Sequence, residues 1–224
     1  MPKEALMEKI TKQQYLNLID GAEVLEKDGH GLKVLDTKKG EMIKLFRRKR
    51  FFSTALFSPY AVRFVNNAKR LQSLGIPTII INRLLWCADI KRHIVIYQRL
   101  AGELLRDVLS ENTDASNKAF LKFAEFIAQL HQSGVYFRSA HLRNILVQPN
   151  GELALIDISD MQIKAKPLSL ALRQRNFEHI LRYQEDKDLM SHQLEAFLSA
   201  YTNASKLSPK QLVSLRQKIE SILG

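Results

Sequence analysis

Residues 141–159 read HLRNILVQPNGELALIDIS. Two apolar runs in this segment are separated by Pro149-Asn150-Gly151, residues typical of a tight turn. We therefore predict two paired strands, over residues 144–148 and 153–158, joined by this turn. An acid, Asp157, stands at the end of the second apolar run, and an amide, Asn144, stands 13 residues before it. These two side chains are the first candidates for a functional site.

Upstream of residue 100 the sequence indicates an antiparallel sheet with one inserted helix. Strands are predicted over residues 22–26 and 32–35, on either side of a Gly29-His30-Gly31 turn, and a third over residues 41–46. A helix follows over about residues 58–74, and Gly75-Ile76-Pro77 stops it. Two more apolar runs, 78–85 and 93–98, are predicted to complete the sheet.

After Ala101-Gly102 the pattern changes to helices. Residues 117–133 place apolar side chains at helical spacing and end at Gly134. A turn-rich loop, 135–143, leads to the 144–158 hairpin. Helices are predicted from about residue 168 onward, and Ser208-Pro209 is a plausible N-cap and first position for the last one.

The order of a β-rich lobe, a short hinge and a helical lobe is typical of a protein-kinase-like fold. We predict an α+β, two-lobed fold of this kind, with a small antiparallel β lobe containing one helix and a mainly helical C-terminal lobe. Residues 1–98 would form the nucleotide-binding lobe, and residues 99–224 would carry the catalytic and metal loops.

Phosphoryl transfer needs metal ions that neutralise the phosphates, a lysine that orients them and a positioned acceptor. Asp157 falls where the kinase D-F-G triplet has its acid, so it would be the main magnesium ligand. Asn144 falls at the position of the catalytic-loop asparagine and would share the metal. The simpler interpretation is a turn-forming acid and a turn amide.

The nucleotide would be held by residues of the first lobe. Met42-Ile43-Lys44-Leu45 resembles the V-A-I-K strand of kinases, so Lys44 would contact the α- and β-phosphates. An exposed surface lysine is the alternative. Gly29 and Gly31 could cover the phosphates with backbone N–H groups, but a hairpin turn needs glycine for its own sake.

From about Ala22 to Tyr183 the chain resembles the lipopolysaccharide core kinases and the toluene-tolerance-type proteins grouped with them. The segments that carry the resemblance are residues 75–78 (GIPT), 131–139 (HQSGVYFRS), 141–146 (HLRNIL), Ile156-Asp157 and 173–176 (RQRN). The resemblance implies an enzyme that uses ATP and magnesium to phosphorylate a sugar, heptose or Kdo, of the lipopolysaccharide inner core. A kinase for another small hydroxyl compound would share every named residue.

Two positions depart from the kinase pattern. The catalytic aspartate of the H-R-D motif falls on Ser139, and serine cannot take a proton at neutral pH without an activating partner. The helix over residues 58–74 has no acid, so the usual partner of the lysine is replaced by Asn67, or by Asn66. An amide can hydrogen-bond Lys44 but carries no charge. A catalytically inactive nucleotide-binding module is therefore the rival interpretation.

Three histidine and acid positions near this loop remain open. His141, three residues before Asn144, could orient or deprotonate an acceptor, or could be a structural histidine that bonds the loop. Asp160 could be a second metal ligand or a cap. His131 is predicted to cap the helix that precedes it.

The composition is that of a globular protein, with 46% hydrophobic and 25% charged residues and one cysteine. The net charge of +11 implies an anionic partner, and the densest basic run is Lys44 to Arg50. No nucleic-acid-binding motif accompanies the charge, which argues against nucleic acid, and no protein partner is predicted. The first residues lack the apolar segment of a secretory signal. We expect a cytoplasmic protein, with peripheral contact to the anionic inner-membrane surface left open.

Overall fold

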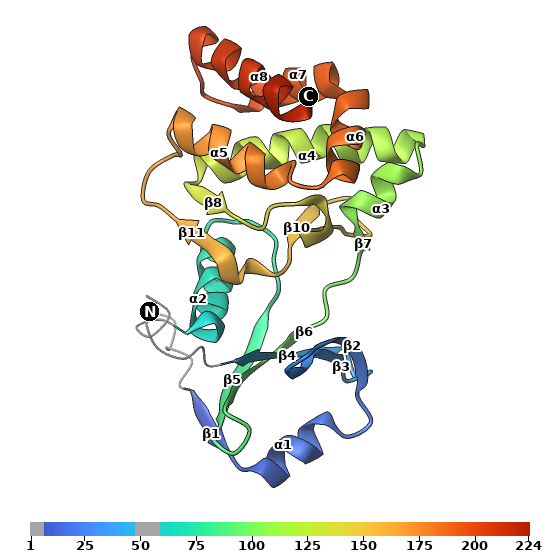
Figure 1. Ribbon diagram of the computed structural model, residues 1–224, viewed down its shortest axis with the longest axis vertical. Helices are drawn as coiled ribbons and strands as arrows, with labels where there is room; N and C mark the ends of the chain where they lie inside the picture. The colour runs from blue at the N-terminus through green and yellow to red at the C-terminus, as the bar shows by residue number, and fades with distance from the viewer. Residues whose placement is uncertain (1–6, 48–58) are drawn as a thin grey trace. The chain divides into compact units, whose positions relative to one another are not determined.

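The computed structural model describes residues 7–47 and 59–224 (Figure 1). The chain divides into two compact units. The first comprises the described residues up to Lys69 together with Ile79–Leu100, and the second comprises Arg70–Thr78 and Ala101–Gly224. Arg48, Lys49 and Arg50 of the basic run, and Ser58 at the predicted start of the helix, lie outside the described residues.

The first unit is built on a six-stranded sheet with the strand order β1-β5-β6-β4-β3-β2. Only the β1–β5 pair is parallel among these neighbours, and the remaining pairs are antiparallel. The strands are β1 (Glu8–Ile10), β2 (Glu23–Asp28), β3 (Gly31–Asp36), β4 (Glu41–Arg47), β5 (Ile81–Cys87) and β6 (Arg92–Gln98). Helix α1 (Lys12–Ile19) places Tyr15 against this sheet, in a core that also contains Ile43, Cys87 and Ile94.

Helix α2 (Tyr60–Ser73) carries an apolar stripe that explains its packing. Ala61, Phe64, Ala68 and Leu71 recur at helical spacing and are buried. The Phe64 ring lies 5.4 Å from that of Phe46 on β4 and 5.8 Å from that of Tyr97 on β6, measured between centroids. The helix therefore packs on the sheet of the first unit through Phe64.

The second unit is mainly helical. Ring contacts join three of its helices, since Phe197 lies 5.6 Å from Phe123 and 5.8 Å from Phe177. These aromatic side chains are fully buried and form the centre of the unit. Its helices are α3 (Leu105–Ser110), α4 (Asp114–Gln132), α5 (Leu170–Ile180), α6 (Gln184–His192), α7 (Leu194–Ala204) and α8 (Pro209–Leu223).

Two small sheets lie beside these helices and carry the loops of the candidate site. In the first, β9 (Ile145–Val147) lies between β10 (Leu153–Leu155) and β7 (Glu103–Leu104). In the second, β8 (Val135–Phe137) pairs with β11 (Met161–Ile163). Short 3-10 helices, η2 (Leu142–Asn144) and η3 (Ile158–Asp160), connect the strands.

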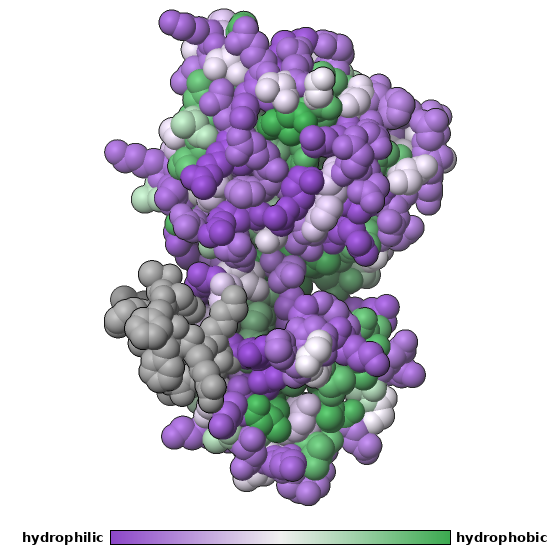
Figure 2. Space-filling view, in the orientation of Figure 1, coloured by the Kyte–Doolittle hydropathy of each residue, from purple (hydrophilic) through white to green (hydrophobic). Residues whose placement is uncertain are grey.

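The surface is mostly hydrophilic on the face shown in Figure 2, with small apolar areas between the polar side chains. Exposed apolar residues in the first unit include Val24 and Leu25 on β2, one of the two edge strands of its sheet. No described helix is both long enough and apolar enough to cross a membrane.

The α+β fold predicted from the sequence is confirmed, and its elements differ in detail. Strand β10 ends at Leu155 rather than residue 158, because Asp157 has a left-handed backbone conformation that a strand cannot contain. Strand β5 begins at Ile81 rather than 78, because the Thr78 hydroxyl donates to the Leu155 carbonyl in the second unit at 2.8 Å. The loop expected over residues 135–143 contains β8, and β1 and α1 were not predicted.

Candidate active site

The β9–β10 hairpin brings Asn144 and Asp157 together. In its register Ile145 pairs with Leu155, and one step further the Ile156 amide donates to the Asn144 carbonyl at 3.0 Å. Asn144 and Asp157 therefore emerge side by side at the open end of the hairpin, within the second unit. The turn predicted at Pro149-Asn150-Gly151 is what produces this register.

The orientation of the Asn144 side chain follows from its hydrogen bonds. Its Nδ2 donates to the Ser139 carbonyl at 2.8 Å and contacts His141 Nε2 at 3.2 Å. A carbonyl can only accept, so the amide nitrogen must face Ser139 and the amide oxygen must face away. This Oδ1 atom has no hydrogen-bond partner among the described residues, which leaves it available as a ligand.

Asp157 has an unusual backbone conformation. Its φ of 50° and ψ of 47° lie in the left-handed region, which residues other than glycine adopt at an energetic cost. The Ser159 hydroxyl donates to Asp157 Oδ1 at 3.4 Å. The conformation turns the chain out of β10 directly after Ile156, and the Asp157 residue is exposed.

A carboxylate and an amide oxygen on neighbouring residues are ligand types that suit magnesium. Magnesium usually keeps several waters, and proteins bind it through one or two carboxylates together with substrate phosphates. Nowhere in residues 7–47 and 59–224 do three or more His, Cys, Asp or Glu side chains gather into a metal site. The Asn144–Asp157 pair therefore fits a metal held jointly with a phosphorylated ligand.

His141 is half-buried, and its ring is committed to the loop. Its Nε2 accepts from the Asn144 amide, which places the ring proton on Nδ1. Nδ1 is buried and has no partner among the described residues. Burial lowers the pKa of His141, so the ring is neutral at pH 7. Asp160 forms an ion pair with Arg138 at 3.6 Å and is not among the ligands grouped with Asn144.

The ion pair between Arg106 and Asp186 anchors the loop that contains His141 and Asn144, and the sequence did not predict it. The Asp186 carboxylate on α6 has no exposed surface, accepts from Arg106 Nε at 2.7 Å and accepts from the Leu142 amide at 3.3 Å. The Arg106 guanidinium lies 5.2 Å from the ring centre of Tyr183, whose ring contacts that of His141. Asp186 lies among other acids in QEDKD, so no local signal distinguishes it in the sequence.

The prediction that His131 caps its helix is wrong. The residue is fully buried, with Nδ1 2.8 Å from the Tyr201 hydroxyl and Nε2 3.2 Å from Asn176 Oδ1. Burial, together with the nearby Arg173 charge, lowers the pKa of His131 from 6.5 to about 3. His131 thus joins α4 to α5 and α7, and Ser133 is the C-cap residue.

The residues predicted to bind the nucleotide lie in the first unit. Lys44 on β4 has its Nζ 5.4 Å from the ring centre of Phe64 and 5.9 Å from that of Phe46. Such cation–π contacts are favourable by about 0.5–2 kcal/mol. Asn67 lies one helical turn after Phe64 and is buried, whereas Asn66 is exposed. Of the two asparagines considered as replacements for the kinase glutamate, only Asn67 is on the packed face of α2.

Gly29 and Gly31 lie at the β2–β3 hairpin of the first unit. Gly31 has a φ of 113°, and the His30 amide donates to Asp28 Oδ1 at 2.8 Å. The structure thus groups Lys44, Asn67, Gly29 and Gly31 with the first unit, and Ser139, His141, Asn144 and Asp157 with the second.

Solved structures share this fold. A high-resolution crystal structure of WbdD aligns with a TM-score of 0.50 at 16% identity, over 84% of this chain and 43% of that chain. A structure of the bifunctional kinase-methyltransferase WbdD aligns with a TM-score of 0.51, also at 16% identity, over 84% of this chain and 42% of that chain. The chain thus spans less than half of the WbdD chains, and the likeness places it in the class of two-lobed, protein-kinase-like folds.

The sequence narrows this class to a family. Residues 22–201 match the sequence profile of the lipopolysaccharide kinase (Kdo/WaaP) family, so the chain belongs to that family. No curated protein matches the chain. The matched segment contains the hairpin glycines, Lys44, the Asn144 loop and Asp157.

Proposed function

We propose that the protein is an ATP- and magnesium-dependent phosphotransferase that acts on a sugar, heptose or Kdo, of the lipopolysaccharide inner core. The observation that carries the proposal is the Asn144–Asp157 pair. The bonds from Asn144 Nδ2 to Ser139 and His141 turn the Asn144 amide oxygen away from these two residues. Membership of the lipopolysaccharide kinase family supports the choice of substrate.

Each residue has a defined task in this proposal. Asp157 and Asn144 Oδ1 hold magnesium, which neutralises phosphate charge when bound. Lys44 contacts the nucleotide phosphates, and its ammonium group lies over the Phe64 and Phe46 rings. Gly29 and Gly31 let the hairpin backbone approach the phosphates. Asn67 supports Lys44 as a neutral polar group on α2.

His141 acts in this scheme by orienting Asn144 rather than by taking a proton. Its Nε2 lone pair already accepts from the Asn144 amide, and its Nδ1 is buried. Phosphoryl transfer depends mainly on positioning and charge stabilisation. Turnover is therefore compatible with Ser139 in place of the usual carboxylate, and Ser139 contributes through its carbonyl oxygen.

The proposal is tested by calorimetric titration of ATP with and without magnesium. Asp157→Asn should abolish the magnesium-dependent part of the affinity, whereas Glu152→Gln, an acid in the turn of the same hairpin, should not. Lys44→Met, which keeps the packing against Phe64 but loses the charge, should weaken ATP binding by about tenfold to a hundredfold. Lys39→Met, in an exposed turn of the first unit, is its control. ATP binding that is equal with and without magnesium in the wild type would rule out the metal assignment.

A nucleotide-binding module without turnover is the second candidate, and Ser139 and Asn67 are the residues that favour it. The assay is transfer of labelled phosphate from ATP to core oligosaccharide. Transfer by the wild type supports the kinase. Transfer by Ser139→Asp but not by the wild type would show that the natural chain is an inactive binding module. If the wild type transfers phosphate only to another small hydroxyl compound, the assignment as a kinase stands and the proposed substrate is wrong.

A further inference from the structure

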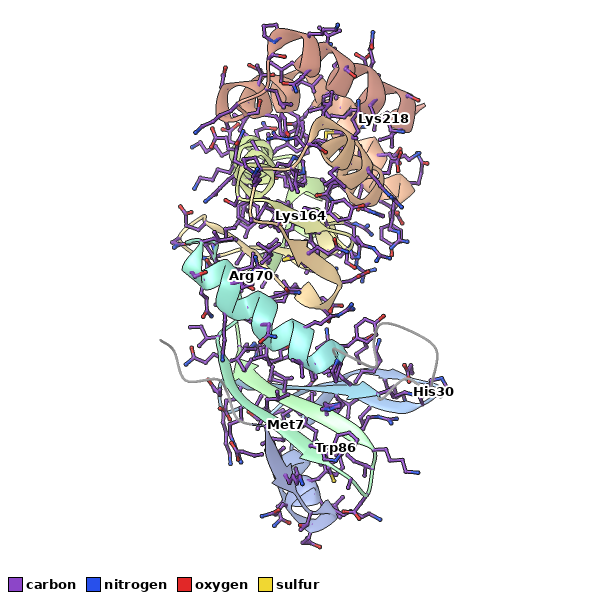
Figure 3. The ribbon with its side chains drawn as sticks, turned by 90° about the vertical axis from the view of Figure 1, so that its left-hand side faces the viewer. Met7, His30, Arg70, Trp86, Lys164 and Lys218 are labelled. Carbon is purple, nitrogen blue, oxygen red and sulfur yellow. The ribbon has the colours of Figure 1, made fainter. Side chains whose placement is uncertain are left out.

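A polar cavity lies in the second unit, and neither Asn144 nor Asp157 is among its lining residues. It has a volume of 390 Å³ and is formed by the end of α2, the end of α4 and the segment that follows β11. Its polar lining residues are Arg70, Ser73, Gln132, Ser133, Lys164 and Lys166. Figure 3 shows Arg70 and Lys164 near one another on the face that it presents.

The lining of this cavity is cationic. Arg70, Lys164 and Lys166 form no ion pair with a described carboxylate, and no acid is among the lining residues. Three positive charges around one small cavity repel each other unless an anion lies between them. The cavity therefore has the electrostatics of an anion site.

A buried arginine adds to this positive potential. Arg173 is 2% exposed, and the hydrogen-bond acceptors around its charge are neutral. Its Nε donates to the Leu168 carbonyl at 3.0 Å, and its Nη1 donates to the Tyr201 hydroxyl at 3.1 Å. With its amide oxygen turned inward, Gln132 accepts from Arg173 Nη2 at 3.2 Å. Gln132 also lines the cavity, so the buried charge lies one residue behind the cavity wall.

The wall that carries the two lysines is fixed by backbone bonds. The Lys164 amide donates to the Gly134 carbonyl at 2.9 Å, and the Leu168 amide donates to the His131 carbonyl at 2.8 Å. Between these two anchors, the amides of Ala165 and Lys166 donate to no described residue. They are therefore available as backbone donors to a ligand, as in other anion-binding loops.

Positive side chains near a helix C-terminus can serve to bond its last carbonyls, but the bonded carbonyls of α2 and α4 do not explain Arg70, Lys164 and Lys166. The last carbonyls of α2 already accept from backbone amides, because Leu74 donates to Arg70, Ile76 to Leu71 and Gly75 to Gln72. At the end of α4, Ser133 donates to Gln129 and Gly134 donates to His131. Since these five carbonyls already accept from backbone amides, they do not require the three side-chain cations, which remain for an external anion.

We infer that this cavity is a binding site for a phosphate group, held by Arg70, Lys164 and Lys166 with the backbone amides of Ala165 and Lys166. Three cations and two N–H donors around a small volume suit a tetrahedral, multiply charged oxyanion better than a single carboxylate. Such a group is available on an anionic phospholipid head or as a free phosphate. The inference is independent of the proposed phosphotransfer, because it involves none of the residues assigned to ATP or magnesium.

The test compares the triple variant Arg70→Ala, Lys164→Ala, Lys166→Ala with a charge-matched control. Lys118→Ala, Lys187→Ala, Lys210→Ala removes the same charge from three lysines of the same unit that also form no ion pair with a described carboxylate. One arm titrates inorganic phosphate and follows the amide chemical shifts of Ser133, Ala165 and Lys166. The other measures binding to vesicles of phosphatidylglycerol and of phosphatidylcholine at constant ionic strength.

We expect the triple variant to bind at least one of the two probes about tenfold more weakly than the control does. Loss confined to phosphatidylglycerol vesicles identifies a lipid headgroup, and loss of the phosphate-induced shifts identifies a soluble phosphate. Equal binding by the triple variant and the control in both arms would overturn the inference. Circular dichroism of both variants checks that the fold is retained.

Discussion

At the scale of single residues, the candidate site depends on the amide orientation of Asn144. Two acceptors fix it, and only one of them, His141 Nε2, belongs to a side chain that can be replaced. His141→Ala should lower turnover by about tenfold or more and raise the magnesium concentration needed for half-maximal rate, because the amide loses one of its two restraints. The Gln side-chain oxygen in His141→Gln can also accept a hydrogen bond from the Asn144 amide. This variant should therefore recover part of the turnover and part of the magnesium affinity.

This prediction separates a positioning residue from a general base and from a purely structural one. A base would make turnover depend on pH without changing the magnesium requirement. A structural histidine would change the melting temperature and leave the magnesium requirement of the folded protein unchanged. The measurement is a magnesium titration of the reaction rate for the three proteins, together with their melting curves.

At the scale of elements, His131 joins α4, α5 and α7 and should make their packing sensitive to acid. The folded-state pKa of His131 is about 3, compared with an ordinary histidine pKa of 6.5, so folding favours its neutral form. The corresponding stability is fully present above about pH 6.5 and is lost as the pH falls toward the folded pKa. From about pH 7.5 to about pH 5, protonation of the unfolded chain at this one residue should remove about 2 kcal/mol from the free energy of unfolding.

The test is denaturant unfolding of the wild type and of His131→Gln at both pH values. The variant is expected to be less stable at neutral pH but to lose less stability on acidification. His141 and His179 also have lowered pKa values, mainly through burial, but they contribute equally to both proteins. An identical pH dependence in the two proteins would contradict the assignment of the acid sensitivity to His131.

The junction between α4 and β8 depends on a glycine. Gly134 has a φ of 74°, and a Cβ atom there would lie 2.6 Å from the carbonyl oxygens of both Lys164 and Lys166. Gly151 has a similar φ of 77°, but a Cβ there would meet only the flexible Lys122 Nζ, at 3.2 Å. We expect Gly151→Ala to cost about 1–2 kcal/mol from backbone strain alone, and Gly134→Ala to cost more than that.

Thermal or denaturant unfolding of the two alanine variants measures this difference directly. Both glycines have similar positive φ values, so both variants should lose a similar free energy through backbone strain. The difference between their stabilities therefore measures the steric clash of the Cβ atom at residue 134. Equal losses in the two variants would mean that the 164–166 segment moves away from Gly134 without cost.

Elements with strong local signals were predictable from the sequence, and so was the Asn144–Asp157 pair. The Pro149-Asn150-Gly151 turn defines the hairpin, and the hairpin register makes the two residues neighbours. The roles of His131 and Asp186 were not predictable, because each depends on partners that are far away in the sequence, such as Tyr201 for His131 and Arg106 for Asp186. Helix α1 was missed for a different reason: its Thr11–Gln14 capping box is a weak signal, and Tyr15 is its only buried residue.

At the scale of the whole molecule, the residues named in the proposal come from both units. The excess of 34 lysines and arginines over 23 acids suits an acidic or phosphorylated acceptor, and it does not identify one. Family membership supplies the expectation of a lipopolysaccharide sugar. The central claim, that this chain transfers phosphate to the inner core, therefore needs a direct test on the core itself.

The most direct test is mass spectrometry of the core oligosaccharide from cells that lack the gene, with wild type or Asp157→Asn supplied in its place. We predict that the core of the deletion strain lacks one phosphate, that the wild type restores it and that Asp157→Asn does not. Glu152→Gln, expressed at the same level, should restore it as the wild type does. A core whose phosphate content is unchanged by deletion of the gene would contradict the account.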